Sequence, residues 1–487
     1  MTTRAAEQVK HELWMRRARL ADRRPFEELL ANEFCTPAEL AAWQRTALAT
    51  LVRFAVSATD YYAAVFAGLG LTAADIDGSS ALPKLPLLHK HEVIASQRAL
   101  CARQLPPGEQ VATVTESAGT TGRPVQVYHS AASAQMFGLL ACRAMRWFGF
   151  DPAATLVSVT IPTELPKPDG VLRVPDCALV QTPGWSYVAP YFHTGPHYAF
   201  SNANSIAQQL HWLRQIKPQY IKGFPSLFEE WLLASGGAAP LEGLQGLLGI
   251  SAQMTPALRA RIEQGYHIPV HQGYGLNEIG IVAGRCAAGR YHVHAEHCLV
   301  EIVDDNGDPS APGQTGKIVV TGLRNFAMPL IRYDTGDLAV AVTGPCACGR
   351  GLPAFGEIEG RYRRFTGLPA GTRGRVQALI DVIAGARPEH LGFLRRYQIY
   401  QDRHNRFELR LVTIASIPDA FQATVVQAWA SVAGTPAVPL VVREVTAIEP
   451  APSGKALDFA SEFHLDASVN PTVATAMSAE QDDESIV

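Results

Sequence analysis

The chain has 487 residues, too many for one ordinary hydrophobic core, so we expect two or more domains. Hydrophobic residues make up 47% and charged residues 18%, which is typical of a globular protein and excludes a disordered one. The formal net charge of −3 provides no basic field for nucleic acid. No apolar run approaches the roughly 18 residues that cross a bilayer, and the N-terminus lacks the apolar core of a signal peptide. We therefore predict a cytoplasmic protein that binds neither nucleic acid nor a membrane.

Helices and strands alternate along much of the chain after a helical beginning. Segments rich in Ala, Glu and Arg with recurring Leu predict that residues 1–100 are mainly helical. A β-branched strand is expected over 111–114, and Ser130 is placed to cap the helix that follows. Later helices alternate with strands, which indicates a largely parallel sheet. The helices are expected over 204–216, from Pro225 and near 256–265, and the strands over 220–222 and 270–272.

Two later changes of pattern divide the rest of the chain. From 298 we expect antiparallel hairpins, with strands over 298–303 and 317–321 around a turn at 305–308. After 360–361, helices are expected over 377–384 and 418–433, and strands over 397–401, 406–413 and 440–447. We predict an α/β fold with a large N-terminal domain of mainly parallel sheets plus an antiparallel β subdomain, and a small hinged α+β C-terminal domain. The expected bounds are 1–100 for the helical segment, 101–360 for the core of the large domain, 361–467 for the small domain and 468–487 for a disordered tail.

Residues 117–124 (SAGTTGRP) place two glycines and three hydroxyl side chains directly after a strand. Glycines let the backbone approach an anion closely, and the amides and hydroxyls can hold phosphate oxygens. The Gly-Lys-Ser/Thr ending of a Walker loop is missing. An ordinary polar turn explains this segment equally well when it stands alone.

Three charged residues near turns are candidates for nucleotide chemistry. Glu278 comes after the strand through Tyr274, where a carboxylate could hold Mg²⁺ against phosphate oxygens. Asp337 begins a strand after a Thr-Gly turn and could accept hydrogen bonds from both ribose hydroxyls. Lys455 lies on a Pro-Ser-Gly turn of the small domain, where a flexible cation can be carried into a phosphate site. A solvated side chain is the commoner explanation for each residue alone.

The order of five segments changes these interpretations: 117–124, 274–278, 333–337, 360–361 and 452–455. With this order, the chain resembles the adenylate-forming superfamily over roughly residues 55–460, and most closely its phenylacetate–CoA ligase-like branch. The resemblance implies an ATP-dependent ligase that joins a carboxylic acid to AMP, releases pyrophosphate and then transfers the acyl group. Glu278 would bind the catalytic Mg²⁺, and Lys455 would bridge the attacking carboxylate and the α-phosphate. The residues that would bind ATP are Ser117, Gly119, Thr120, Thr121, Gly122, Tyr274, Gly275, Asp337 and Arg361.

Cysteines and histidines gather between residues 286 and 348, a grouping that favours a metal over a disulfide in a reducing compartment. Four N/S ligands suit tetrahedral Zn²⁺, and some members of the ligase branch look similar here. We predict a closed, structural zinc site formed by Cys286, His292, Cys346 and Cys348. The alternatives are free thiols beside a histidine-rich strand, and the rival ligands His294, His297 and Cys298.

The chain departs from the family pattern at three places, and the unusual hinge region leaves the acyl acceptor open. Arg123 replaces the usual lysine, Asn277 replaces threonine, and 362–364 (YRR) stands where the hinge usually has an acidic residue. Residues 365–371 also lack the usual loop beside the pantetheine channel. CoA is the default acceptor, with an amine, a carrier-protein thiol or an inorganic nitrogen nucleophile as alternatives. Aromatic density over 161–200 suggests a planar or aryl acid, and an ordinary hydrophobic core explains it equally well.

Two other functions and the oligomeric state also remain open. A catalytically retired member would bind nucleotide without turning it over, and a zinc-dependent hydrolase would need an open coordination position on the metal. A homodimer is the assembly left open.

Overall fold

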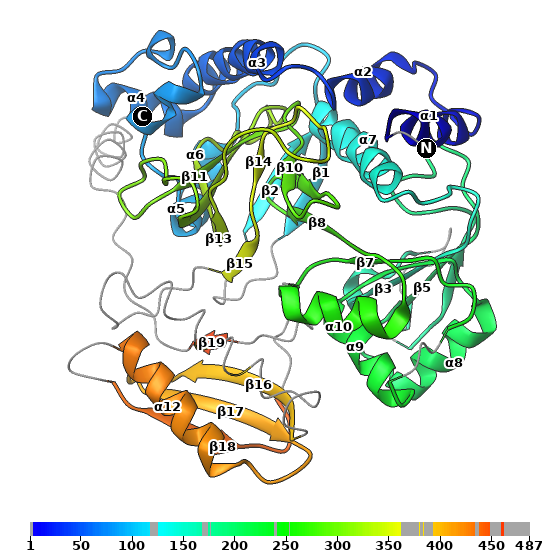
Figure 1. Ribbon diagram of the computed structural model, residues 1–487. Coiled ribbons are helices and arrows are strands. Elements are labelled where there is room, and N and C mark those ends of the chain that lie inside the picture. Colours follow the sequence, from blue (N-terminus) through cyan, green and yellow to red (C-terminus); the bar gives the residue numbers. More distant parts are fainter. Residues whose placement is uncertain are drawn as a thin grey trace, which may run out of the picture. The chain divides into compact units, whose positions relative to one another are not determined.

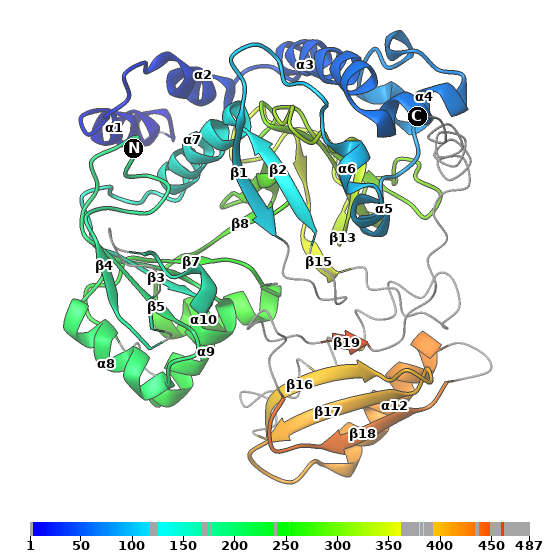
Figure 2. The same ribbon diagram turned by 180° about the vertical axis from the view of Figure 1, so that it is seen from behind.

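A computed structural model of the chain describes residues 3–116, 125–167, 174–175, 177–237, 241–252, 254–361, 379, 383, 393–433, 438–448 and 459–461 (Figures 1 and 2). The chain divides into two compact units, with the boundary after Gly360. Within the described ranges, no helix is both long and apolar enough to span a membrane. The cytoplasmic location, the hinge and the bounds of the helical segment and tail stay predictions.

Helices dominate the beginning of the larger unit, as predicted. They are α1 (Thr3–Met15), α2 (Arg24–Asn32), α3 (Pro37–Ala58), α4 (Asp60–Leu69), α5 (Lys90–Ala95) and α6 (Gln97–Leu100), with 3-10 turns at Ala73–Asp75 and Ser79–Lys84. The sequence explains where α3 begins. The hydroxyl of Thr36 accepts a hydrogen bond from the amide of Glu39, whose carboxylate accepts one from the amide of Thr36. This capping box, followed by Pro37 at the first helical position, supplies partners for amides that a helix leaves free.

A short hairpin connects these helices to α7. Strands β1 (Val111–Glu116) and β2 (Gln126–Ser130) pair antiparallel on either side of 117–124, which lie outside the described residues. Helix α7 (Ala131–Trp147) begins after Ser130, as predicted, but the expected cap is wrong. The Ser130 hydroxyl donates instead to the carbonyl of Arg324 at 3.2 Å, so a distant chain segment engages it rather than the helix.

A mixed sheet follows, with the strand order β14-β10-β9-β8-β7-β6-β3-β5-β4 among the described residues. Its centre, β5-β3-β6-β7-β8, is parallel and its ends are antiparallel. The strands are β3 (Leu156–Thr160), β4 (Val180–Thr182), β5 (His197–Ser201), β6 (Tyr220–Gly223), β7 (Gly246–Gly249), β8 (Val270–Leu276), β9 (Gly280–Arg285), β10 (Tyr291–Val293) and β14 (Ala354–Phe355). The helices are α8 (Ile206–Ile216), α9 (Pro225–Ala234) and α10 (Pro256–Tyr266), with a 3-10 turn at Pro162–Glu164.

The two faces of the parallel strands pack into different cores. Val157 and Ile221 contribute to the core formed with α8, α9 and α10, which cover that face in Figures 1 and 2. Leu156 and Tyr220 contribute to a second core that includes Trp185 and side chains of α1, α2 and α7. Because side chains alternate along a strand, every second residue of β6 points to this second face. Most residues of these central strands are therefore buried on both faces, as expected for the centre of a parallel sheet.

The predicted antiparallel subdomain is a four-stranded sheet with the order β11-β12-β13-β15. Its strands are β11 (Cys298–Val303), β12 (Thr315–Gly322), β13 (Tyr333–Val340) and β15 (Ile358–Arg361). We expected Asp337 to begin a strand, and this is wrong, because Asp337 lies inside β13. The pairing shifts register between Lys317 and Val319, opposite Gly336, whose φ of 75° lies in the left-handed region that favours glycine. The Thr-Gly turn is thus a bulge that redirects Asp337 within a continuous strand.

The smaller unit has its own sheet and core, and the predicted fold class is confirmed. Its described strands are β16 (Leu394–Gln401), β17 (Phe407–Thr413), β18 (Leu440–Glu444) and β19 (Phe459–Ser461), in the order β18-β17-β16-β19, and its described helix is α12 (Asp419–Ala433). Leu409, Val425 and Trp429 belong to the core between sheet and helix. Of the helix predicted over 377–384, only residues 379 and 383 are described, and both are helical.

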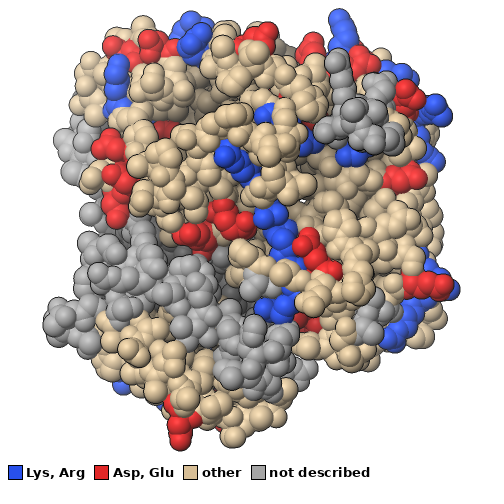
Figure 3. Space-filling model, viewed as in Figure 1, with Lys and Arg blue, Asp and Glu red and all other residues tan. Residues whose placement is uncertain are grey.

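Two arginines on α7 anchor the larger unit through buried ion pairs. Arg143 is fully buried and donates two hydrogen bonds to Glu296, at 2.9 and 3.0 Å. Arg146, one turn later, lies 3.3 Å from Glu33 at the end of α2. Burial raises the pKa of the Glu33 carboxyl, and the positive charge of Arg146 opposes that shift. On the face drawn in Figure 3, by contrast, described acidic and basic side chains lie among one another.

Glu296→Gln should destabilise the larger unit because it leaves the buried Arg143 without its anion. Removing one partner of such a pair costs about 3–5 kcal/mol, so we expect the first thermal transition to fall by about 5 °C or more. The matched control is Glu242→Gln, which breaks the exposed pair between Glu242 and Lys217 and should shift Tm little. Equal shifts in the two variants, measured by scanning calorimetry, would contradict this role for Glu296.

Candidate functional site

Two buried carboxylates link the two sheets of the larger unit through reciprocal hydrogen bonds. The hydroxyl of Tyr274 on β8 donates to Oδ2 of Asp337 on β13 at 2.7 Å. In the opposite direction, the hydroxyl of Tyr333 on β13 donates to Oε1 of Glu278, just after β8, at 3.1 Å. Glu278 and Asp337 are 8% and 7% exposed. A tyrosine on β8 therefore orients the aspartate on β13, and a tyrosine on β13 orients the glutamate after β8.

The surroundings of Glu278 fit a cation. Its carboxylate is buried and forms no ion pair with any residue in the described part of the chain. Burying a carboxylate without a cation is costly, so such a group favours a metal ion or another positive partner. Oxygen ligands of this kind are the ones that Mg²⁺ prefers. The residues present therefore fit the predicted Mg²⁺, which would be held by Glu278.

Asn277 ties this carboxylate to the β1–β2 hairpin. Thr115 donates to the Asn277 carbonyl at 2.6 Å, and Nε2 of His129 lies 3.2 Å from the same oxygen. The Asn277 amide donates to the carbonyl of Glu116 at 2.7 Å. Burial lowers the pKa of His129, which favours the neutral ring. Both strands that flank 117–124 are thus fastened to the residue before Glu278.

A second aspartate in the same segment was missed by the sequence reasoning. Asp334 is 8% exposed, lies 3.2 Å from Nδ1 of His89 and accepts a hydrogen bond from the Gly336 amide at 3.0 Å. Burial works against ionisation of Asp334, but the hydrogen bonds from His89 and Gly336 outweigh it and its pKa lies below the ordinary value. Asp334 therefore braces the bulge that aims Asp337. Asp334 belongs to the motif at 333–337, which was a signal for its role. Nothing in the sequence, however, indicates that His89 is its partner.

The structure brings together only part of the predicted nucleotide site. Tyr274, Gly275, Glu278 and Asp337 lie on or beside β8 and β13. The backbone of Arg361 ends β15, and its side chain is not described. The predicted residues that lie outside the described ranges are Ser117, Gly119, Thr120, Thr121, Gly122 and Lys455. Their roles stay predictions, as do the departures at Arg123 and over 362–371.

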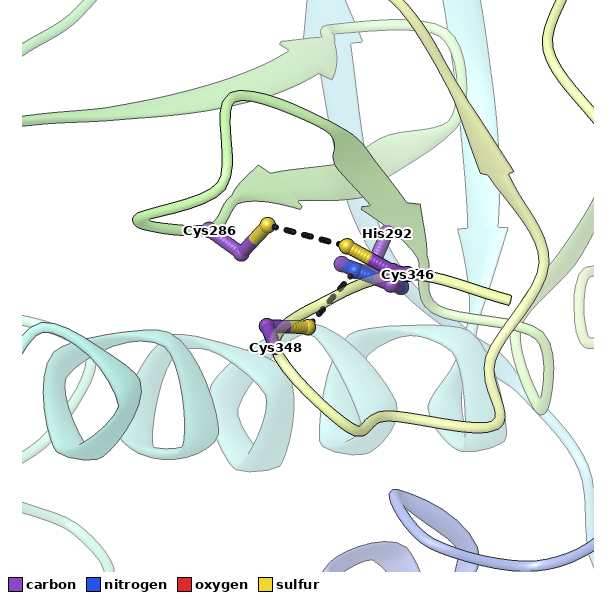
Figure 4. A group of neighbouring side chains, drawn as sticks. All are labelled: Cys286, His292, Cys346 and Cys348. Atoms are coloured by element: carbon purple, nitrogen blue, oxygen red, sulfur yellow. Dashed lines mark hydrogen bonds between the residues drawn. The ribbon is translucent and has the colours of Figure 1, made fainter. Parts of the chain in front are cut away.

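The four predicted zinc ligands lie together in the larger unit. Cys286 follows β9, His292 lies on β10, and Cys346 and Cys348 come from the segment between β13 and β14 (Figure 4). Their ligand atoms all lie within 4.8 Å of one another. The Sγ atoms of Cys286 and Cys346 are 3.7 Å apart, and Sγ of Cys348 is 3.1 Å from Nε2 of His292.

This arrangement fits a tetrahedral metal ion. A Zn–S distance near 2.3 Å implies sulfur atoms about 3.8 Å apart around a tetrahedral ion, close to the spacing of Cys286 and Cys346. Nδ1 of His292 lies 3.1 Å from the Leu352 carbonyl, so it carries the proton and leaves Nε2 as the ligand atom. Burial lowers the pKa of His292 to about 4, which keeps the ring neutral near pH 7. The donor set therefore suits the predicted zinc.

The three rival ligands make other contacts. Nδ1 of His294 lies 2.6 Å from Nη2 of Arg143, and Nε2 of His297 lies 2.7 Å from the Ile279 carbonyl. The thiol of Cys298 is 3.8 Å from the Val282 carbonyl. None of the three belongs to the group of four in the described part of the chain.

Comparison with known proteins places the chain in a family. Residues 72–328, just over half of the chain, match the family described as AMP-binding enzyme. The phenylacetate-coenzyme A ligase of Thermus thermophilus is 27% identical over 332 residues, covering 66% of this chain and 70% of that protein. That of Escherichia coli is 26% identical over 274 residues, covering 52% and 56%.

A solved structure shares the fold. The 2-hydroxyisobutyryl-CoA ligase in the postadenylation state, in complex with 2-HIB-AMP, has a TM-score of 0.64 and 18% identity, covering 93% of this chain and 94% of that one. As the ordered motifs predicted, the chain belongs to the AMP-binding enzyme family, in the phenylacetate–CoA ligase-like branch of the adenylate-forming superfamily.

Proposed function

We propose that this protein is an AMP-forming ligase that joins a carboxylic acid to AMP, releases pyrophosphate and transfers the acyl group to CoA. The observation that supports it most is the reciprocal arrangement of Tyr274, Asp337, Tyr333 and Glu278, inside or beside the segment that matches the AMP-binding enzymes. One carboxylate is poised for ribose hydroxyls and the other for a cation. A phosphate-binding segment between β1 and β2 completes the set.

Each described residue has a separate task in this proposal. Asp337 accepts hydrogen bonds from the ribose hydroxyls while Tyr274 holds its Oδ2 atom. Glu278 binds Mg²⁺, which when bound neutralises negative charge on the phosphates. Asn277 keeps the β1–β2 hairpin beside Glu278, so that phosphate and metal ligands move as one assembly. A buried, preorganised site of this kind reduces the reorganisation needed during the reaction.

The first reaction needs alignment more than proton transfer. The acid is already ionised near pH 7, so its oxygen can attack the α-phosphorus without a general base. A bond forms between that oxygen and phosphorus as the bond to pyrophosphate breaks. Two anions must approach each other, and Lys455 offsets their repulsion by contacting both.

CoA is the acceptor we favour. The curated relatives are phenylacetate-coenzyme A ligases, and the structural neighbour is also a CoA ligase. An amine, a carrier-protein thiol or an inorganic nitrogen nucleophile would replace CoA only in the second reaction, and adenylate formation would be unchanged. A homodimer and an aryl acid remain parts of the proposal.

We also propose that Cys286, His292, Cys346 and Cys348 bind one structural Zn²⁺. With four protein ligands the ion would have no open coordination position. A zinc-dependent hydrolase needs such a position, so this site does not support that alternative. The metal would join the β9–β10 turn to the segment before β14.

Lys455→Ala should separate binding from chemistry. We expect near-normal ATP binding but at least about 10²-fold slower acyl-dependent pyrophosphate release, since the repulsion between the anions is no longer offset. The matched control is Arg443→Ala, which removes an exposed cation of the smaller unit. Pyrophosphate release near the wild-type rate from Lys455→Ala would contradict the assignment, and an absence of release with every acid tested on the wild type would support a catalytically retired protein.

Two tyrosine variants should have different effects because their hydroxyls serve different carboxylates. Losing a hydrogen bond to a charged group corresponds to about a 10-fold effect. Tyr274→Phe should raise KM for ATP by about that factor, whereas Tyr333→Phe should raise the Mg²⁺ concentration for half-maximal rate. Each variant serves as the control for the other. Identical changes in both parameters for the two variants would contradict separate ribose and metal roles.

Zinc should be present at about one ion per chain in metal-replete protein. Cys346→Ser should lower that content and the Tm of the larger unit, because one of four ligands is lost. Cys177→Ser, which alters an exposed thiol, should do neither. Less than about half a zinc per wild-type chain, by elemental analysis, would overturn this part of the proposal.

A further inference from the structure

Lys222, a lysine at the carboxyl end of a central strand, has no counter-ion in contact with it in the part of the chain that the structure describes. Lys222 is the third residue of β6 and lies in register with Ser158 on the neighbouring parallel strand β3. It shares a face of the sheet with Tyr220, the face opposite α8–α10. Among the residues that the structure describes, its ammonium group forms neither a hydrogen bond nor an ion pair, and it lies 5.6 Å from the ring centroid of Tyr187.

The polar side chains around Lys222 form hydrogen bonds with one another. Nε2 of His197 hydrogen-bonds with the hydroxyl of Ser158 at 2.9 Å, and its Nδ1 with the hydroxyl of Thr182 at 2.8 Å. Burial and the positive charge of Lys222 lower the pKa of His197 to about 4, so this ring is neutral near pH 7. Glu164 is the acidic group whose field reaches Lys222, but its carboxylate is exposed and accepts a hydrogen bond from Thr160 at 2.8 Å.

Two aromatic rings connect this lysine to the carboxylate segment. Gly280 lies two residues after Glu278, and a Cβ atom there would be 3.3 Å from Cδ2 of Phe137 on α7. The rings of Phe137 and Tyr187 meet edge to face with centroids 5.2 Å apart. A side chain at Gly280 would therefore crowd Phe137. Phe137 contacts Tyr187, and Tyr187 in turn lies beside Lys222.

Tyr187 has an unusual conformation for an aromatic residue. Its φ of 65° lies in the left-handed region, and its side chain is 56% exposed despite packing against Phe137. Non-glycine residues in this region cost free energy, and they gather at ligand sites. The turn that holds Tyr187 is closed by hydrogen bonds from Val188 and Ala189 to the Trp185 carbonyl. The ring is thus held away from the core, beside the cation.

We infer that Lys222 binds a second anionic group on the carboxylic acid substrate, at the end remote from the carboxylate that is activated. This inference rests on the proposed function. Phe137 and Tyr187 contact the planar or aryl body between the two charged groups. In open α/β sheets, ligands bind beyond the carboxyl ends of the strands, where Lys222 lies. The substrate class is therefore a dianionic acid, of which an aromatic dicarboxylate is the simplest member.

The test compares matched acids that differ by one distal carboxylate. Acid-dependent pyrophosphate exchange is measured with benzoate and terephthalate, phenylacetate and 4-carboxyphenylacetate, and hexanoate and adipate. The wild type should prefer the dianionic member of at least one aromatic pair. Lys222→Met should lower kcat/KM for that dianion by about 10²-fold while changing the monoanion little, because a charge-assisted contact is lost. Lys222→Arg should retain most of the preference.

Lys217→Met is the matched control, since Lys217 is an exposed lysine five residues earlier with its charge paired to Glu242. It should leave the ratio of dianion to monoanion unchanged. A ratio that is the same in the wild type and Lys222→Met overturns the subsite but leaves the ligase proposal intact.

Direct binding separates the two proposals further. Calorimetric titration of terephthalate and 4-carboxyphenylacetate into the wild type and Lys222→Met does not depend on turnover. Binding to the wild type that is lost in Lys222→Met supports the subsite, whether or not any acid gives pyrophosphate exchange. An absence of exchange with every acid would contradict the ligase proposal alone. Equal binding, or none to the wild type, overturns the subsite.

Discussion

Reciprocal hydrogen bonds between two tyrosines and two carboxylates connect the sheets on which the candidate site depends. Tyr274 and Glu278 belong to β8 and its end, while Tyr333 and Asp337 belong to β13. Neither carboxylate can move without disturbing a hydroxyl on the other strand. Since the two strands lie in different sheets, these contacts define their relative position at the site. Preorganisation of this kind lowers the free-energy cost of binding a ligand whose two ends require different partners.

The same arrangement leaves the Glu278 carboxylate without a positively charged partner among the described residues. A buried carboxylate loses hydration, and one hydrogen bond from a neutral hydroxyl recovers only part of that loss. Glu278 has no cation among its described contacts, in contrast to Glu296, which Arg143 binds twice. One acidic group is therefore internally neutralised and stabilises the fold, while the other is the carboxylate that we propose as the Mg²⁺ ligand. Burial alone does not separate the two carboxylates, since Glu278 and Glu296 are both buried, but their described partners do.

The sequence predicted features that depend on neighbouring residues more successfully than features that depend on distant ones. The position of Glu278 after a strand followed from local strand signals, and the four metal candidates followed from spacing and resemblance. The cap at Ser130 failed because Arg324 competes for the hydroxyl, and the bulge at Asp337 depends on pairing with β12. Lys222 could not be singled out, because Tyr187 approaches it, and Phe137 approaches Tyr187, only in the folded chain. The contacts of the rival ligands His294, His297 and Cys298 likewise depend on distant residues that the sequence does not reveal.

Helix α7 couples the stability of the larger unit to the proposed substrate specificity. Phe137 lies near its middle, against Gly280 and the ring of Tyr187. Arg143, fewer than two turns later, is held by Glu296. The buried ion pair therefore restricts rotation and sliding of the helix that presents Phe137. Because packed interiors transmit small displacements, a shift of α7 would alter the space between Gly280 and Tyr187 before the fold itself was lost. Selectivity for the length of the acid should consequently be more sensitive to this ion pair than nucleotide binding, which depends on β8 and β13.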